Sequence, residues 1–357
     1  MTGAITGGTA VRSRSIYLDA LRAVALTRVV VYHALSWKWI TLASAMPLMF
    51  FIAGSLYAGS VDRRPVGRVI VDRYRRILLP YWVYAVAMLV LWGTLGVLDQ
   101  LDVIDWVGFA FPLLSPNGPQ GPGAGTDLEL TWIALWYLQF HLFLSLIGGL
   151  LRRAQQRRPV VTWSVIGALF FGGIIVGSGI VVIVFYTACW VAGYHQHDGQ
   201  LDAPVRRHGW LICILSGPMG LALGLAFEGS ATTSLMAARG AAIGAALLGV
   251  FWLTFALAIR PVAEPWLSRW HLPAIIHWFS QRSLSIYLWH MVAIYAALTW
   301  ALPGTSSPFM VLVWCIPLTL VAVVAVGWVE DVAAKRRPSL WPLLPAARPR
   351  GRTSAGA

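Results

Sequence analysis

Long apolar runs alternate with short basic or turn-forming segments along almost the whole chain. An α-helix rises about 1.5 Å per residue, so about 20 apolar residues cross the roughly 30 Å of hydrocarbon in a bilayer. The pattern therefore predicts an all-α polytopic membrane protein. We expect ten transmembrane helices, over residues 16–38, 42–60, 77–98, 130–151, 160–177, 180–195, 209–227, 235–259, 281–302 and 308–329.

Lysine and arginine are concentrated in alternate connections between these runs. From the N-terminus, every second connection carries 2, 6, 4, 2, 2 and 6 of them when Arg282 is assigned to the ninth span, and the other connections carry none apart from Lys38. Cytoplasmic loops are enriched in positive residues. We therefore expect both termini in the cytoplasm, Arg22 near the cytoplasmic face and His33 towards the outer half of the membrane.

The composition excludes a soluble globular domain. Hydrophobic residues make up 58% of the chain and charged residues 11%, with a mean hydropathy of +0.69, whereas soluble domains are about 25% charged. The net charge of +13 follows from the basic connections, so no nucleic-acid partner is expected. We expect one membrane domain over residues 1–336 and a disordered cytoplasmic tail, rich in proline and arginine, over residues 337–357.

The first apolar run contains four ionisable residues, Asp19, Arg22, Arg28 and His33. Such side chains cost at least about 2.5 kcal/mol in hydrocarbon, so they usually face a protein interior and mark function. Arg22 and His33 are eleven positions apart, which places them on one helix face about 16 Å apart. Asp19 can form an i, i+3 ion pair with Arg22. Arg28 points elsewhere, to a neighbouring helix or a polar groove, and structural hydrogen bonding between helices is the alternative for all of these residues.

A dense arginine cluster lies in the segment DRYRRILLPYW, residues 72–82. Guanidinium groups match phosphate oxygens in geometry and charge, so Arg73, Arg75 and Arg76 are candidate phosphate ligands. The alternative is an anchor near anionic lipid. With Arg22 expected at the same depth, a phosphate-bearing cytoplasmic ligand is favoured. His33 could then act as a general base on a hydroxyl, because the ordinary pKa of histidine, about 6.5, suits proton abstraction near neutrality.

Four segments of the chain resemble signatures of the acyltransferase-3 family of membrane O-acyltransferases. SIYLDALRAVALTRVVVYHA is similar to the first span of that family, which carries an Arg or Lys, ten residues and then His, here Arg22 and His33. DRYRRILLPYW resembles the Arg-x-x-Arg motif, here Arg73 and Arg76. LWYL (residues 135–138) and SLSIYLWH (residues 283–290) resemble two further signatures, in the same order along the chain.

The resemblance implies an enzyme that transfers an acyl group, commonly acetyl, from cytoplasmic acyl-CoA to a hydroxyl of a cell-surface or lipid-linked glycan. It implies His33 as base, Arg22 as the cation that binds or orients the donor thioester, and Arg73 and Arg76 as ligands of the CoA phosphates. It also implies a multi-pass protein of the bacterial plasma membrane, with acyl-CoA, a glycan acceptor and membrane lipids as partners. The histidine that often precedes the LWYL-like motif is absent, and His141 lies too far downstream to replace it directly.

Several other residues could support the site or simply pack. We expect Trp136, Tyr137, Tyr287 and His290 to support the site. The alternatives are interfacial or packing aromatic residues for Trp136 and Tyr137, and a structural hydrogen bond for His290. Asp127 and Glu129, at the outer mouth of the fourth span, could be acceptor-side groups or could orient His33. Glu228 and Glu330 lie near span ends and are expected to be solvated. No metal is expected at His195, His197, Asp198 and His208, because they lack further spaced ligands.

Two other functional classes stay open from the sequence. A transporter or lipid flippase could use the same buried charges as a proton or substrate pathway, although no paired halves with matched broken helices are evident. A scaffold for glycan synthesis is the third reading. The intact Arg22/His33 and Arg73/Arg76 pairs argue against a scaffold.

Overall fold

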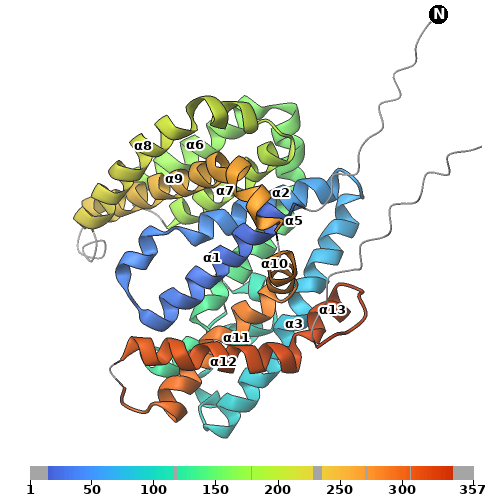
Figure 1. The fold of residues 1–357 in the computed structure, drawn as a ribbon. Helices are drawn as coiled ribbons and strands as arrows, with labels where there is room; N and C mark the ends of the chain where they lie inside the picture. The colour runs from blue at the N-terminus through green and yellow to red at the C-terminus, as the bar shows by residue number, and fades with distance from the viewer. Residues whose placement is uncertain are drawn as a thin grey trace, which may run out of the picture.

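The computed structural model describes residues 15–115, 119–177, 179–227, 235–269, 272–305 and 307–340. Over these residues the chain is helical and contains no strand (Figure 1). Short 3-10 turns link several of the helices. The α-helices are α1 (Ile16–Leu35), α2 (Ala45–Val61), α3 (Val66–Thr94), α4 (Val103–Ala110), α5 (Trp136–Arg157), α6 (Pro159–Val176), α7 (Ile180–His197), α8 (Asp202–Phe227), α9 (Leu235–Leu267), α10 (Leu272–Gln281), α11 (Ser283–Ala296), α12 (Pro308–Val326) and α13 (Trp328–Ala333).

Within the described residues, eight helical segments have the length and composition to cross a membrane. The predicted all-α polytopic membrane protein is thereby confirmed, whereas ten spans and cytoplasmic termini stay predictions. The helix α1 is not among the eight, because its 20 residues include Asp19, Arg22 and Arg28. The eight segments are Lys38–Val61, Val66–Thr94, Asp127–Arg157, Pro159–Val176, Asp202–Phe227, Met236–Leu267, Ser283–Ala301 and Pro308–Val326.

Several helix boundaries differ from those that the apolar runs predict, and three of the differences bear on the site or its surroundings. The helix α3 begins at Val66 rather than at residue 77, directly after Pro65, so the arginine cluster lies inside the helix. The helix α9 continues to Leu267 rather than ending at residue 259. The ninth predicted span, 281–302, corresponds to the segment Ser283–Ala301, but a separate helix, α10, precedes it and ends just before Arg282. Hydropathy alone missed these boundaries because polar residues continue the helices beyond their apolar parts.

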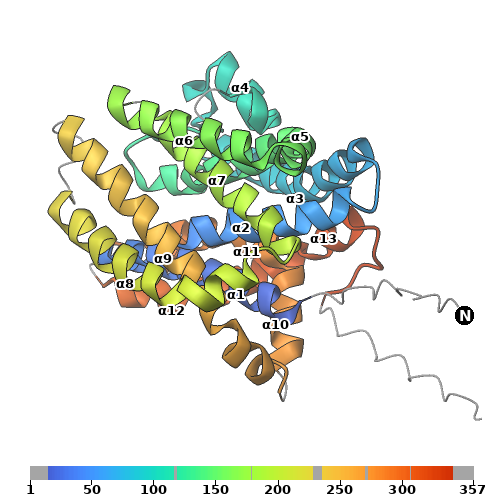
Figure 2. The ribbon, with the colours of Figure 1, turned by 90° about the horizontal axis from the view of Figure 1, so that it is seen from above.

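The charged helix α1 lies in the middle of the molecule. It contacts α2, α9, α10, α11 and α12, and Figure 2 shows it between α2 and α10. The helices α8 and α9 pack side by side at one end of the molecule (Figure 1). Neighbouring helices therefore cover α1 on several sides, as its ionisable side chains require in a membrane.

The segment after α12 folds back on the helices instead of leaving them. Arg282 is fully buried and donates a hydrogen bond to Asp331 of α13 (2.7 Å) and another to the carbonyl of Ser339. Arg336 forms a second ion pair with Asp331 (2.9 Å). Of the tail predicted to be disordered, residues 337–340 are described and include Ser339, whereas residues 341–357 lie outside the described residues, as do residues 1–14.

Glycines let α2 and α7 pack with their backbones nearly in contact. A Cβ added to Gly54 of α2 would lie 2.1 Å from the carbonyl oxygen of Trp190, and one added to Gly193 of α7 would lie 2.2 Å from that of Phe51. Small residues at helix crossings allow this approach in membrane proteins. The contact matters for the site because it holds Trp190 beside an arginine of α3.

We predict that Gly54→Ala destabilises the protein. The new methyl group would meet the backbone of α7, which cannot move aside as a flexible side chain could, so we expect a loss of about 1–3 kcal/mol. Gly167→Ala is the matched control, because a Cβ there meets nothing within 4 Å. Thermal unfolding in detergent measures the difference, and equal midpoints for the two variants would contradict the close α2–α7 contact.

Candidate active site

Three of the predicted arginines line one cavity, which we call the arginine cavity. Its volume is about 260 Å³. Arg22 comes from α1, and Arg73 and Arg76 come from one face of α3, since they are three residues apart. Side chains from α2, α5, α10, α11 and the segment after α12 complete the lining, which includes Tyr137, His141, Tyr287, Glu330 and Arg336.

Aromatic rings hold Arg73 in this position. Its guanidinium carbon lies 4.8 Å from the centroid of the Tyr57 ring and 5.9 Å from that of Trp190. Cation–π contacts of this kind compensate part of the cost of removing a cation from water. The Trp190 ring is itself fixed by a hydrogen bond from Nε1 to the hydroxyl of Tyr194 (2.7 Å). Arg73 is thus an oriented cation, whereas Arg76 is exposed.

Arg75, also expected to bind the donor, does not line the arginine cavity. Its Nε donates to the carbonyl of Ala333 in α13 (2.8 Å), and its NH2 group lies 3.6 Å from Asp72. Arg75 therefore ties α3 to α13. One residue along a helix is a rotation of about 100°, which separates it from the face shared by Arg73 and Arg76.

His33 lines a second cavity, of about 280 Å³, which we call the histidine cavity. Ser36, Asp127, Thr305 and Ser307 provide its other polar groups, and the rest of the lining is apolar. Ser36 ends α1 with a positive φ of 55°, a conformation that is uncommon for a residue other than glycine. Arg22 and His33 thus lie towards opposite ends of α1 and face different cavities.

A row of rings connects the two cavities. The ring centroids of His33 and His290 are 5.5 Å apart, those of His290 and Tyr287 are 6.0 Å apart, and those of Tyr287 and Tyr137 are 5.2 Å apart. The hydroxyl of Tyr287 donates to the carbonyl of Ala134, so its proton is already engaged. The predicted supporting residues Tyr137, Tyr287 and His290 are therefore brought together with the arginines and His33.

Trp136 lies at the edge of this row, where its ring meets that of Tyr137 edge-on with centroids 6.4 Å apart. Its ring stacks on Tyr186 with centroids 5.9 Å apart and contacts Phe140 edge-on. It does not line the arginine cavity. Of the two roles open to it from the sequence, the structure places it among packing aromatic residues.

His141 is a site residue that the sequence analysis set aside. It lines the arginine cavity, and its ring centroid lies 5.8 Å from that of Tyr137. In the described part of the chain its Nδ1 is buried without a hydrogen-bond partner. The four-residue spacing from Tyr137, which puts the two on one face of α5, was the available signal.

The other ionisable residues of α1 have structural contacts. Asp19 is buried and accepts a hydrogen bond from the hydroxyl of Ser280 in α10 (2.8 Å); its ion pair with Arg22 stays a prediction. Arg28 donates from Nε and NH2 to the carbonyl of Ile40 (3.0 and 2.7 Å). Arg28 thus fixes the connection after α1, which agrees with a role separate from that of Arg22.

Glu330 is half-buried rather than fully solvated as expected, because α13 folds back towards α3 and α11. Its Oε1 accepts the backbone N–H of Ser285 (2.8 Å) in the first turn of α11. Burial raises the pKa of Glu330 to about 7, although the hydrogen bond and nearby arginines favour its charged form. An acidic group that titrates near neutrality thus shares the arginine cavity. Glu228 lies outside the described residues.

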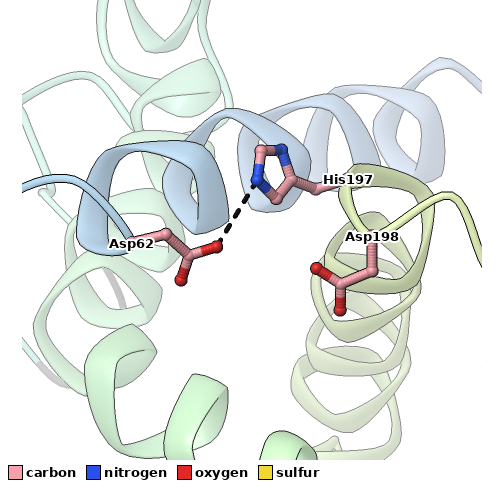
Figure 3. Close-up of side chains that lie close together, drawn as sticks. All are labelled: Asp62, His197 and Asp198. Carbon is pink, nitrogen blue, oxygen red and sulfur yellow. Dashed lines mark ion pairs between the residues drawn. The ribbon is translucent and has the colours of Figure 1, made fainter. Parts of the chain in front are cut away.

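An acidic cluster lies at the ends of α2 and α7, where Asp62 faces His197 and Asp198 (Figure 3). Candidate ligand atoms of these three residues lie within 4.8 Å of one another. Arg152 of α5, only 4% exposed, donates to both carboxylates at 2.7 to 3.3 Å. This guanidinium supplies the positive charge that a metal ion would otherwise provide, so the cluster is an ion-pair network between three helices.

Of the three histidines predicted near this network, one lies against it and two do not. His197 lies 3.4 Å from Asp62, but His195 binds Trp163 (2.9 Å) and Gln200, and His208 is exposed on α8. Asp62, 135 positions before His197, could not be grouped with it from spacing alone. The absence of a bound metal in the functional protein stays a prediction.

Comparison with known proteins identifies the family. A family model described as an acyltransferase domain, Acyl_transf_3, matches residues 15–328, nearly the whole chain. No curated protein and no solved structure matches the chain. The matched region includes the helices that supply Arg22, His33, Arg73 and Arg76. The chain therefore belongs to the acyltransferase-3 family and is a multi-pass membrane acyltransferase.

Proposed function

We propose that the protein transfers an acyl group, in the first instance acetyl, from acyl-CoA to a hydroxyl of a cell-surface or lipid-linked glycan. The observation that carries the proposal is the arginine cavity, in which Arg22, Arg73 and Arg76 converge from two helices. A row of rings joins it to His33 in a second cavity. One cavity suits an anionic donor, and the other suits a hydroxyl-bearing acceptor.

Donor binding follows from the chemistry of the arginine cavity. CoA carries several phosphate oxygens, and guanidinium groups bind such oxygens through charge-assisted hydrogen bonds. Arg73 is held by rings and Arg76 is exposed, so an anion entering the cavity would meet Arg76 first. The flexible arm of CoA would then carry the thioester past Tyr137 and Tyr287 towards His33. The basic connections favour entry of the donor from the cytoplasmic side of a bacterial plasma membrane.

His33 would act as the general base. Its imidazole takes the proton of the acceptor hydroxyl while the oxygen bonds to the acyl carbon, and the carbon–sulfur bond breaks. The proton passes from His33 to the departing sulfur. The products are the ester and free CoA thiol, and no metal is required by this balance. Arg22 would bind and orient the donor.

Two features support an enzyme over a transporter or flippase. The ionisable groups gather in two cavities with a phosphate-type cation set on one side and a base on the other. Family membership also points to acyl transfer. A transporter would move a solute without releasing thiol from any acyl-CoA, so thiol release separates the two functions.

We predict that Arg76→Ala weakens acetyl-CoA binding by about tenfold or more. A hydrogen bond to a charged group contributes about 1.5–3 kcal/mol, and about 1.4 kcal/mol corresponds to a factor of ten in Kd. Arg68→Ala is the matched control, because Arg68 lies on the same helix, is exposed and does not line the cavity. Titration calorimetry with purified protein measures both. An equal loss in the two variants would mean that the arginines act only as general surface charge.

We also predict a pH dependence of donor binding from Glu330. With a pKa of about 7, the carboxyl is mostly neutral near pH 6 and mostly ionised near pH 8. The negative charge that appears as pH rises opposes an anionic donor. The Kd ratio of wild type to Glu330→Gln should therefore be near one at about pH 6 and rise severalfold at about pH 8. Glutamine keeps an oxygen for the Ser285 N–H, and a ratio independent of pH would contradict the assignment.

A further inference from the structure

His290 is a fully buried histidine with one unused nitrogen. It is 0% exposed, and its Nδ1 lies 2.7 Å from the carbonyl oxygen of Tyr287. A carbonyl only accepts hydrogen bonds, so Nδ1 carries the proton and, in the neutral ring, Nε2 carries the lone pair. Within the described residues, no group donates a hydrogen bond to Nε2.

A buried nitrogen acceptor is unfavourable unless it receives a hydrogen bond in the functional state. A buried acceptor without a partner costs about 1–3 kcal/mol, and such groups in folded proteins call for an explanation. The backbone contact holds the ring, and Cys315 of α12 contacts the carbonyl of His290 (3.7 Å). His290 is therefore fixed from two sides while its Nε2 stays open.

The ring that faces His290 across the helix interface is that of His33. The two centroids are 5.5 Å apart with an angle of 47° between the planes. A direct N–H to N hydrogen bond of about 3 Å would bring the centroids to roughly 5 Å. A small rotation of His33 closes the remaining gap of about half an ångström, and catalytic hydrogen bonds often tighten only when substrate is bound.

We propose that His290 is a positioning residue that selects the tautomer of His33. An N–H of His33 donates to Nε2 of His290, so the other nitrogen of His33 carries its lone pair towards the histidine cavity. That nitrogen takes the proton of the acceptor hydroxyl. The proposal rests on the proposed function for its chemical meaning, because only a base needs its lone pair aimed at a substrate.

His290 itself neither takes nor gives a proton during the reaction. When His33 becomes the imidazolium, its hydrogen bond to the neutral His290 becomes charge-assisted and stronger. His33 then returns the proton to the departing sulfur of CoA. His290 lines neither the arginine cavity nor the histidine cavity, which separates it from the reacting atoms. In a histidine, the hydrogen bond made by one ring nitrogen determines which of the two nitrogens carries the proton and which is free to react.

The first test measures the tautomer without any substrate. The full chain is labelled with ¹⁵N-histidine, and the His33 signals are identified by their loss in His33→Gln. We expect one neutral tautomer of His33 in the wild type and a mixture of both in His290→Phe, whereas His290→Gln, which still offers an acceptor, restores a single tautomer. An unchanged tautomer ratio in a folded His290→Phe protein would overturn the proposal, whether or not acyl transfer has been established.

The second test measures release of free thiol from acetyl-CoA in membranes that contain the full chain. We expect His290→Phe to lower the rate about 10- to 100-fold, as loss of a group that orients a reactive residue does, with an unchanged Kd for acetyl-CoA. Recovery in His290→Gln marks an orienting hydrogen bond rather than packing. His208→Ala is the control, since His208 is exposed on α8. A loss in both His290 variants as large as that of His33→Gln would contradict the positioning role and make His290 the base.

Discussion

The structure depends on covering the ionisable side chains of α1. Asp19, Arg22, Arg28 and His33 lie in a helix that is otherwise apolar, and exposure of such groups to lipid is costly. The fold surrounds α1 with α2, α9, α10, α11 and α12. Each polar group then receives protein surroundings of its own: a serine hydroxyl, a backbone carbonyl or one of two cavities. The helices that shield the ionisable side chains of α1 from lipid also form the site.

Two cavities joined by rings divide the chemistry along α1. Cations gather at the Arg22 end, and His33 lies at the other end beside Asp127 and hydroxyl groups. The rings of Tyr137, Tyr287 and His290 lie between the two ends. Under the proposed function, this division would let an anionic donor and a hydroxyl acceptor approach from different sides. The folded-back α13 and the residues after it line the arginine cavity with Glu330, Ala334 and Arg336.

Local spacing in the sequence predicted the arginine site because the relevant residues share helix faces. Arg73 and Arg76 are one turn apart, so helical geometry alone places them on one face of α3. That Arg22 of α1 shares their cavity depends on how the helices pack. Interhelical packing decides the positions of Arg75, His141 and Glu330. Contacts between residues distant in the sequence determine that packing, so local spacing could not predict it. The Asp62–Arg152–Asp198 network joins three helices for the same reason. Apolar runs likewise could not show that α3 starts at Val66 or that Arg282 divides α10 from α11.

The most direct test of the account uses acetyl-CoA carrying a labelled acetyl group, incubated with membranes that contain the full chain. Free thiol and labelled ester in the membrane material are measured for wild type, His33→Gln and His208→Ala. The account predicts that both products form together in wild type and His208→Ala and fall by about 10²- to 10⁴-fold in His33→Gln, while donor binding is kept. Full product formation by His33→Gln, or no thiol release by folded wild-type protein that binds acetyl-CoA, would contradict it.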